Sequence, residues 1–139
     1  KPAYINAEHR LIAHMMQSKE IAYKIKQLLG DITLNIDDHQ AIINYLYGYF
    51  EESEEADSTL FLTYIPDPQL RRIVSQIQMM SVSPEPSDQE LKDYIGVVLK
   101  QQKMLKIKEK EAEQAEAIRL GNHIEAAKIA SEIIQLKSF

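Results

Sequence analysis

Histidine is the side chain best suited to metal binding or proton transfer at neutral pH. This sequence has four: His9, His14, His39 and His123. Two metal ligands on one helical face are typically four residues apart. None of the histidines has such a partner, and His9 and His14 are five residues apart. The spacing therefore favours ordinary surface or helix-capping roles over a metal site.

A second candidate for acid/base chemistry is the consecutive cluster Asp37, Asp38 and His39. An apolar, helix-like segment follows it, and acidic side chains are stabilised at the start of a helix by the helix dipole. Capping therefore explains the cluster better than catalysis does. Phosphate-binding glycine loops, Gly-x-Ser-x-Gly and His-Glu-x-x-His are all absent from the sequence. We expect no catalytic site, no cofactor and no metal.

Tyr45, Tyr47 and Tyr49 have aromatic rings of the kind that stack on nucleobases. Stacking platforms lie in basic grooves, however, and here an acidic run from Glu51 to Asp57 follows. The whole chain has a net charge of −5, whereas affinity for phosphate depends on Lys and Arg. We therefore expect the tyrosines to pack in the core and no direct binding of nucleic acid. The acidic run is predicted to be a solvated connection, with a surface for a basic partner as the alternative.

The composition indicates which elements must position these residues. The chain has 139 residues, 45% of them hydrophobic, and only 4 Gly and 5 Pro, which predicts an all-α fold with a buried core. Cysteine is absent, which fits a reducing compartment, and we expect the cytoplasm. No apolar run approaches the roughly 20 residues of a membrane span, and no leader is recognisable. Because residue 1 is Lys, not Met, we expect a fragment.

Capping residues divide the first half into helices. We predict that Asn6 begins the first helix, that Ser18 begins a second ending at Gly30, and that Asn35 with Asp38 forms a capping box. The third helix, rich in tyrosine and isoleucine, is predicted to be central and most buried. Two shorter helices are predicted to begin at Asp57 and at the pair Asp67-Pro68.

A long helix is predicted for the second half. Ser87 and Glu90 form a capping box, no Pro follows, and Gly96 is the only Gly before Gly121. Such a helix spans roughly 50 Å, more than a body of about 100 residues can cover. Its apolar residues lie on two arcs about 130° apart. The first arc holds Leu91, Tyr94, Ile95, Val98 and Leu99, and the second holds Met104, Ile107, Ala112, Ala115 and Ile118.

Two arcs imply two packing units. We predict a helical bundle subdomain over residues 1–103 and a C-terminal helical hairpin over residues 104–139, joined by a long connecting helix. Asn122 is predicted to cap the last helix.

The last helix has an apolar arc about 180° wide, more than one neighbouring helix covers. We predict that its alanines, Ala126, Ala127 and Ala130, face the other hairpin helix. The larger Ile129, Ile133 and Leu136 are then left for a partner protein. The alternative is that the hairpin folds back on the main body.

Several short segments together resemble a known family. They are Ala7-Glu8-His9-Arg10-Leu11-Ile12, Asn35-Ile36-Asp37-Asp38-His39-Gln40, Tyr45-Leu46-Tyr47, Pro86-Ser87-Asp88-Gln89-Glu90-Leu91, Asp93-Tyr94-Ile95 and the alanine-rich hairpin. In order and spacing they are similar to the C-terminal helicase-binding domain of bacterial DNA primase of the DnaG type.

The resemblance implies a bundle similar to the N-terminal domain of the replicative helicase, followed by a hairpin that docks on the N-terminal domains of that hexameric helicase. The bundle would modulate helicase activity, and the domains for primer synthesis would lie upstream of Lys1. Candidate helicase-binding residues are Ile118, Asn122, Ile129, Ile133, Leu136 and Phe139. We expect a monomer without catalytic activity of its own, at the replisome. The alternative is a homodimerisation module whose hairpin pairs with its own copy.

Overall fold

The computed structural model describes residues 1–138, and within this range the chain forms α-helices and no strand. This confirms the predicted all-α class. The helices are α1 (Ala3–Met15), α2 (Lys19–Leu29), α3 (Asp37–Glu52), α4 (Ser58–Tyr64), α5 (Pro68–Gln78), α6 (Asp88–Arg119) and α7 (His123–Lys137). No helix among these residues is long and apolar enough to cross a membrane.

The chain divides into two compact units, Lys1–Val98 and a second that starts at Leu99. We call them the bundle unit and the hairpin unit. Helix α6 contributes its first turns to the bundle unit and the remainder to the hairpin unit. Each unit has a separate cluster of buried apolar side chains.

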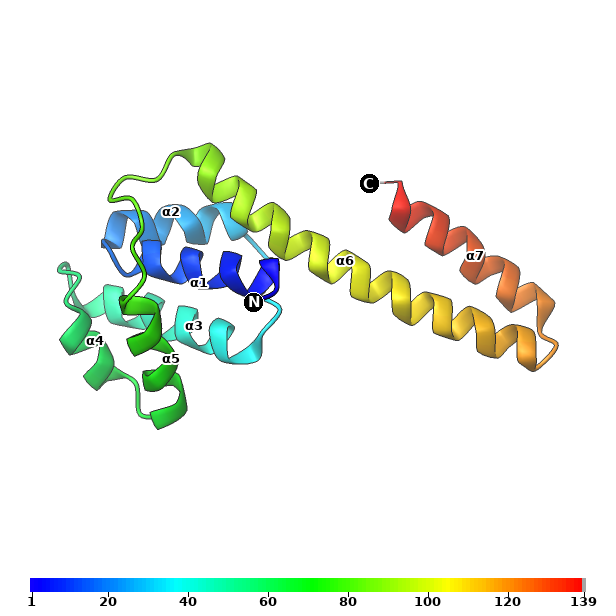
Figure 1. Ribbon diagram of the computed structural model, residues 1–139, viewed down its shortest axis with the longest axis horizontal. Coiled ribbons are helices and arrows are strands. Elements are labelled where there is room, and N and C mark those ends of the chain that lie inside the picture. The colour runs from blue at the N-terminus through cyan, green and yellow to red at the C-terminus, as the bar shows by residue number, and fades with distance from the viewer. Residues whose placement is uncertain (139) are drawn as a thin grey trace. The chain divides into compact units, whose positions relative to one another are not determined.

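Within the bundle unit, α1 packs against α2, α3 and α5, and α3 packs against α2, α4 and α5 (Figure 1). Leu91, Ile95 and Val98 of α6 join the same core. We predicted α3 to be the most buried helix, but α1 buries eight of its 13 residues and α3 six of its 16. The prediction failed because three of the buried α1 residues are the polar Glu8, His9 and His14.

Side-chain caps account for most helix starts. The cap at Asn6 was wrong, because α1 begins at Ala3 after Pro2. The capping box at Asn35 was also wrong, because Ile36 precedes α3 and makes no side-chain cap. The predicted ends at Gly30 and Gly121 are confirmed, with φ angles of 55° and 74° that favour glycine. Confirmed N-terminal caps are Ser18, Asp57, Asp67, Ser87 and Asn122.

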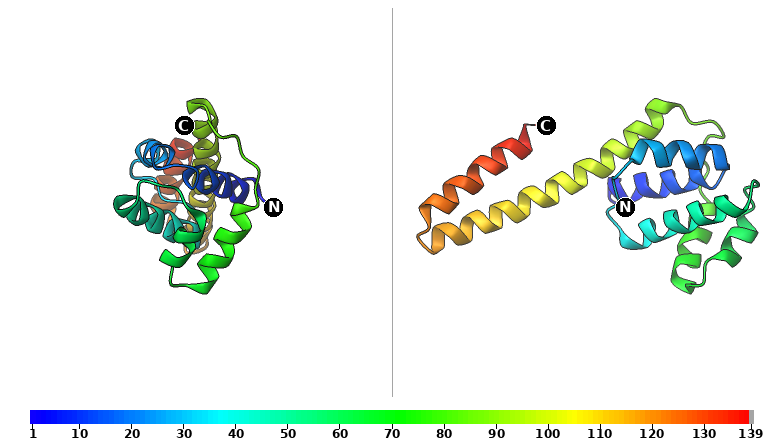
Figure 2. Two further views of the ribbon diagram at one scale, coloured as in Figure 1. Left: turned by 90° about the vertical axis from the view of Figure 1, so that its left-hand side faces the viewer. Right: turned by 180° about the vertical axis from the view of Figure 1, so that it is seen from behind.

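In the hairpin unit, α7 runs antiparallel to the second half of α6 (Figure 2, right). Its core consists of Ala117, Ala126, Ile129 and Ile133, with Ile107 packed against it. Lys110 of α6 forms an ion pair of 2.6 Å with Glu132 of α7.

The second apolar arc predicted for α6 does not face α7. Met104, Ala112, Ala115 and Ile118 are exposed, and of that arc only Ile107 joins the hairpin core. The sequence pattern was misleading because the side of α6 that packs on α7 also includes the half-buried polar residues Lys110 and Gln114.

Candidate functional site

Glu8 is the centre of a buried polar cluster in the bundle unit. Its side chain, on α1, is fully buried. One carboxylate oxygen accepts hydrogen bonds from the Asn35 backbone N–H (2.7 Å) and side-chain amide (3.0 Å). The other accepts from His39 Nδ1 (2.8 Å) and the Ile36 N–H (3.3 Å). The carboxylate thus satisfies backbone donors that the segment before α3 would otherwise bury unpaired.

The cluster extends from Glu8 in two directions. The Asn35 side-chain amide also donates to the Val98 carbonyl oxygen of α6 at 3.1 Å. His39 Nε2 lies 3.1 Å from His9 Nε2, and their rings meet edge to face. Because His39 Nδ1 donates to Glu8, His39 Nε2 is free to accept the proton carried by His9 Nε2. A continuous chain of hydrogen bonds then runs from His9 through His39 to Glu8. The cluster therefore ties α1 to the start of α3 and to α6.

Burial and hydrogen bonding change the acidity of this cluster. Burial by itself would raise the pKa of Glu8, but hydrogen bonds from His39, Asn35 and Ile36 outweigh it and the pKa is lowered. Burial, together with the neighbouring His39, lowers the pKa of His9 to about 4. At neutral pH His9 is therefore uncharged beside an ionised Glu8. Among the described residues, no group of three or more His, Asp or Glu side chains is arranged to hold a metal ion.

His14, one turn farther along α1, is fully buried as well. Its Nδ1 accepts a hydrogen bond from the Gln17 side-chain amide at 2.8 Å, so the proton lies on Nε2, 3.3 Å from a Glu90 carboxylate oxygen. Burial lowers the pKa of His14, although Glu90 opposes this shift. The same Glu90 oxygen accepts a hydrogen bond from the Tyr94 hydroxyl at 2.7 Å.

The sequence prediction of surface or capping roles was thus wrong for His9, His14 and His39, which are all buried. Only His123 is exposed, in the first turn of α7. A signal for Glu8 was present, because positions 8, 11, 12 and 15 lie on one helical face and the other three are apolar. Glu8 was nevertheless not among the predicted site residues.

The low pKa of His9 predicts a loss of stability in acid. The unfolded chain binds a proton at His9 near pH 6.5, whereas the folded chain does so only near pH 4. The contribution of His9 to the free energy of unfolding should therefore fall by about 3 kcal/mol as the pH drops from about 6.5 to about 4. The measurement is urea unfolding at pH 7 and pH 4.

His9→Gln, which cannot titrate, is the matched variant for this prediction. It should lose less stability than the native chain over the same interval, with the remaining loss due to Glu8 and His14, whose pKa values are also lowered. Equal losses in the two proteins would contradict the assignment to His9.

The hairpin unit carries most of the exposed large apolar side chains, although Leu60 and Met79 of the bundle unit are exposed as well. Ile124 of α7 is 87% exposed and Ile134 is 67% exposed. On α6, Met104 and Ile118 are 45% and 54% exposed, and Leu120 lies exposed at the turn. Large aliphatic side chains with this much accessible surface are the usual sign of a contact site when they form one patch.

Helical geometry places these residues on one side of the hairpin. From the face that meets the other helix, the same rotational sense leads to Met104, Ala115 and Ile118 on α6 and to Ala127 and Ile134 on α7. Ile124 lies on the side of α7 away from α6, about 80° around the helix from Ile134. When two helices are antiparallel, rotating about each helix axis in the same sense, viewed from that helix's own N-terminus, leads to the same side of the pair. We call this side, with Ile124 at its outer edge, the exposed hairpin face: Met104, Ala115, Ile118, Ile124, Ala127 and Ile134.

The structure reverses two predicted roles in α7. Ile129 and Ile133, expected to face a partner, are buried in the hairpin core, whereas Ala127, expected to face α6, is exposed. Ala126 is buried in the hairpin core as expected, and Ala130 is half-buried. Burying the isoleucines is more favourable, because an isoleucine side chain removes more apolar surface from water than an alanine side chain does.

The other candidate binding residues have different surroundings. Ile118 is exposed, and Leu136 is half-buried. Asn122 is exposed and accepts a hydrogen bond from the Glu125 backbone N–H, so its side chain caps α7. Phe139 lies outside the described residues.

Fold and site define an all-helical chain of two units, with a polar cluster inside one and an exposed apolar face on the other. No protein-family model matches the chain. The chain is 39% identical over 136 residues to a DNA primase of Geobacillus stearothermophilus, covering 98% of the chain and 22% of that primase. A DNA primase of Listeria monocytogenes is 34% identical over 134 residues, or 96% of the chain and 21% of that protein. A DNA primase of Enterococcus faecalis is 28% identical over 130 residues, which are 94% of the chain and 20% of that protein.

These similarities extend over nearly the whole chain, which is therefore homologous to a segment of bacterial DNA primases. It spans about a fifth of the length of the primases it matches. The resemblance inferred from the sequence is confirmed to this extent.

Proposed function

We propose that this chain is the helicase-binding part of a bacterial primase and that the exposed hairpin face docks on the N-terminal domains of the hexameric replicative helicase. The observation that carries the proposal is the large exposure of Ile124 and Ile134 on a unit with a small core. A unit of this size has little apolar area to spare, so isoleucines left in water indicate a surface that is covered in a complex.

The proposed contact differs from the candidate set taken from the sequence. Ile118 stays in the contact, and Ile124 and Ile134 replace the buried Ile129 and Ile133. Burying one large aliphatic side chain contributes about 1.5 to 3 kcal/mol, so three of them suffice for a specific complex. The bundle unit would modulate the helicase, and the chain would act in the cytoplasm without catalysis or direct contact with DNA.

Ile134→Glu tests the docking face. We expect it to weaken binding to the purified hexameric helicase by at least tenfold, because about 1.4 kcal/mol corresponds to that factor and a carboxylate would have to be desolvated on docking. Isothermal titration calorimetry measures the change. The matched control is Gln135→Glu, which adds the same charge at an exposed position about 100° around α7.

The result distinguishes docking on the helicase from self-association. Equal binding by both variants and the native chain would refute docking through this face. Sedimentation of the chain alone completes the test. A native dimer that Ile134→Glu dissociates, together with no helicase binding, would establish the homodimerisation module instead.

A further inference from the structure

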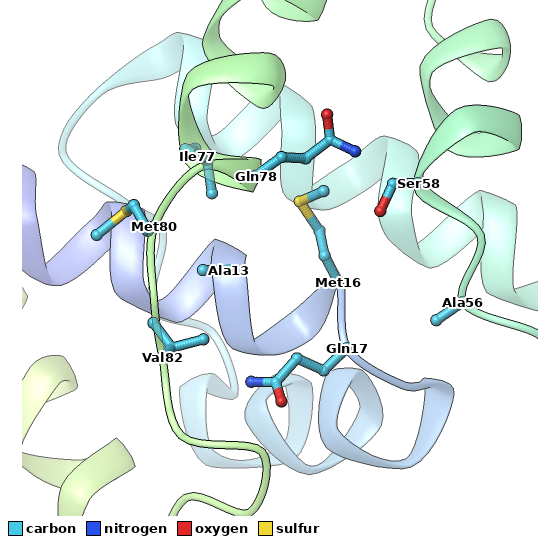
Figure 3. Close-up of a pocket in the computed structure, with 9 residues that line it drawn as sticks. All are labelled: Ala13, Met16, Gln17, Ala56, Ser58, Ile77, Gln78, Met80 and Val82. Carbon is cyan, nitrogen blue, oxygen red and sulfur yellow. The ribbon is translucent and has the colours of Figure 1, made fainter.

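A cavity in the bundle unit has no part in the hairpin contact. It has a volume of about 450 Å³ and is open to solvent. Its walls come from the end of α1, the segment before α4, the end of α5 and the segment after α5 (Figure 3). The lining residues are Ala13, Met16, Gln17, Ala56, Ser58, Ile77, Gln78, Met80 and Val82.

The lining combines polar groups with flexible apolar side chains: Gln17, Ser58 and Gln78 lie beside Met16, Ile77, Met80 and Val82. Met16 and Met80 have flexible thioether side chains, which adjust to differently shaped apolar groups. Met16 also lines a smaller hollow that reaches Phe50 and Phe61 of the core, so movement of this side chain would deepen the cavity. The wall after α5 is held by the Gln17 side-chain amide, which donates to the Ser83 carbonyl oxygen at 3.0 Å.

The surroundings of the cavity are acidic. None of its lining residues carries a charge, and no Lys or Arg occurs between Lys26 and Arg71 or between Arg72 and Lys92. Glu55 and Asp57 flank the lining residue Ala56 in the sequence and are exposed. Lys19, the nearest cation along the chain to the Gln17 wall, forms an ion pair of 2.7 Å with Glu54.

The charge of the two units strengthens this contrast. Residues 1–98 contain 8 Lys and Arg against 15 Asp and Glu, a net charge of −7, whereas residues 99–139 contain 8 against 6, a net +2. The negative potential is thus a property of the unit that holds the cavity. It attracts cationic ligands and repels nucleic acid.

We propose that this cavity is a second docking site, which receives an aliphatic or thioether side chain from a basic amphipathic helix of a partner protein. The methionine, isoleucine and valine side chains of the lining would cover the incoming side chain. The exposed carboxylates of Glu51, Glu52 and Glu55 would pair with Lys or Arg on the polar side of the helix. Glu54 and Asp57 of the same run are already engaged, with Lys19 and with the start of α4. This explains why the acidic run lies beside a cavity lined by two methionines. The site is independent of docking through the exposed hairpin face.

Two synthetic peptides test the proposal on the full chain. Both form an amphipathic helix with the same leucine face, and the polar face carries lysine in one and glutamate in the other. Binding is followed by NMR of the chain labelled with ¹³C in the methionine methyl groups. We expect the lysine peptide to shift the signals of Met16 and Met80 and to leave that of Met104, in the hairpin unit, unchanged. The glutamate peptide should shift none of them.

Two charge variants sharpen the test. Glu55→Lys should weaken binding of the lysine peptide about fivefold, because it replaces an attraction at the cavity by a repulsion. Glu109→Lys, the matched change at an exposed site of the hairpin unit, should leave the affinity unchanged. Equal binding of both peptides, equal effects of both variants or a larger shift at Met104 would overturn the proposal. Shifts of Met16 and Met80 caused by a single-stranded oligonucleotide would overturn it in favour of nucleic acid.

Discussion

Glu8→Ala is expected to lower the free energy of unfolding of the bundle unit by about 3 to 5 kcal/mol, because it removes a fully buried carboxylate that accepts four hydrogen bonds. Alanine favours helix more than glutamate does, so the loss cannot come from α1 itself. The unpaired groups would be the Asn35 and Ile36 backbone N–H, the Asn35 amide and His39 Nδ1.

Tyrosine fluorescence during urea unfolding measures this loss specifically. All seven tyrosines lie between residues 4 and 94, so their signal reports the bundle unit alone. Glu8→Gln keeps one acceptor oxygen and should lose less stability than Glu8→Ala. The control is Glu20→Ala on the exposed side of α2. A loss below about 1 kcal/mol for Glu8→Ala, the value for an ordinary exposed hydrogen bond, would contradict the central role of Glu8.

Ile133→Glu should unfold the hairpin unit and leave the bundle unit folded. Ile133 is 8% exposed and belongs to a core of few apolar residues. The substitution removes about 1.5 to 3 kcal/mol of apolar burial and adds the cost of placing a carboxylate there. A two-helix unit has no comparable reserve of stability. Hydrogen exchange monitored by mass spectrometry should show α7 amides exchanging at nearly unprotected rates.

The neighbouring Ile134 supplies the control for this prediction. Because Ile134 is 67% exposed, Ile134→Glu should leave the protection of α7 unchanged. Similar protection in both variants, or loss of protection only in Ile134→Glu, would mean that the two faces of α7 are assigned the wrong way round.

The positions of helix ends were readable from the sequence because capping is local. Ser18 accepts a hydrogen bond from a backbone N–H three residues later, and Asp57 does the same two and three residues later. Glycine at positive φ ends α2 and precedes α7. Asn35 shows the limit of this reasoning, since its amide has the chemistry of a cap but binds Glu8, 27 positions away in the sequence.

The sequence by itself determined the all-α class, most helix boundaries and, through segments of matching order, the relationship to bacterial DNA primases. Tertiary structure alone decided which polar side chains are buried, because Glu8, His9 and His39 are buried only where α1 meets the start of α3. It also decided which isoleucines remain exposed. The apolar arc of α7 is wider than one helix covers, and neighbouring residues lie about 100° apart, so only the packing on α6 separates the buried Ile133 from the exposed Ile134.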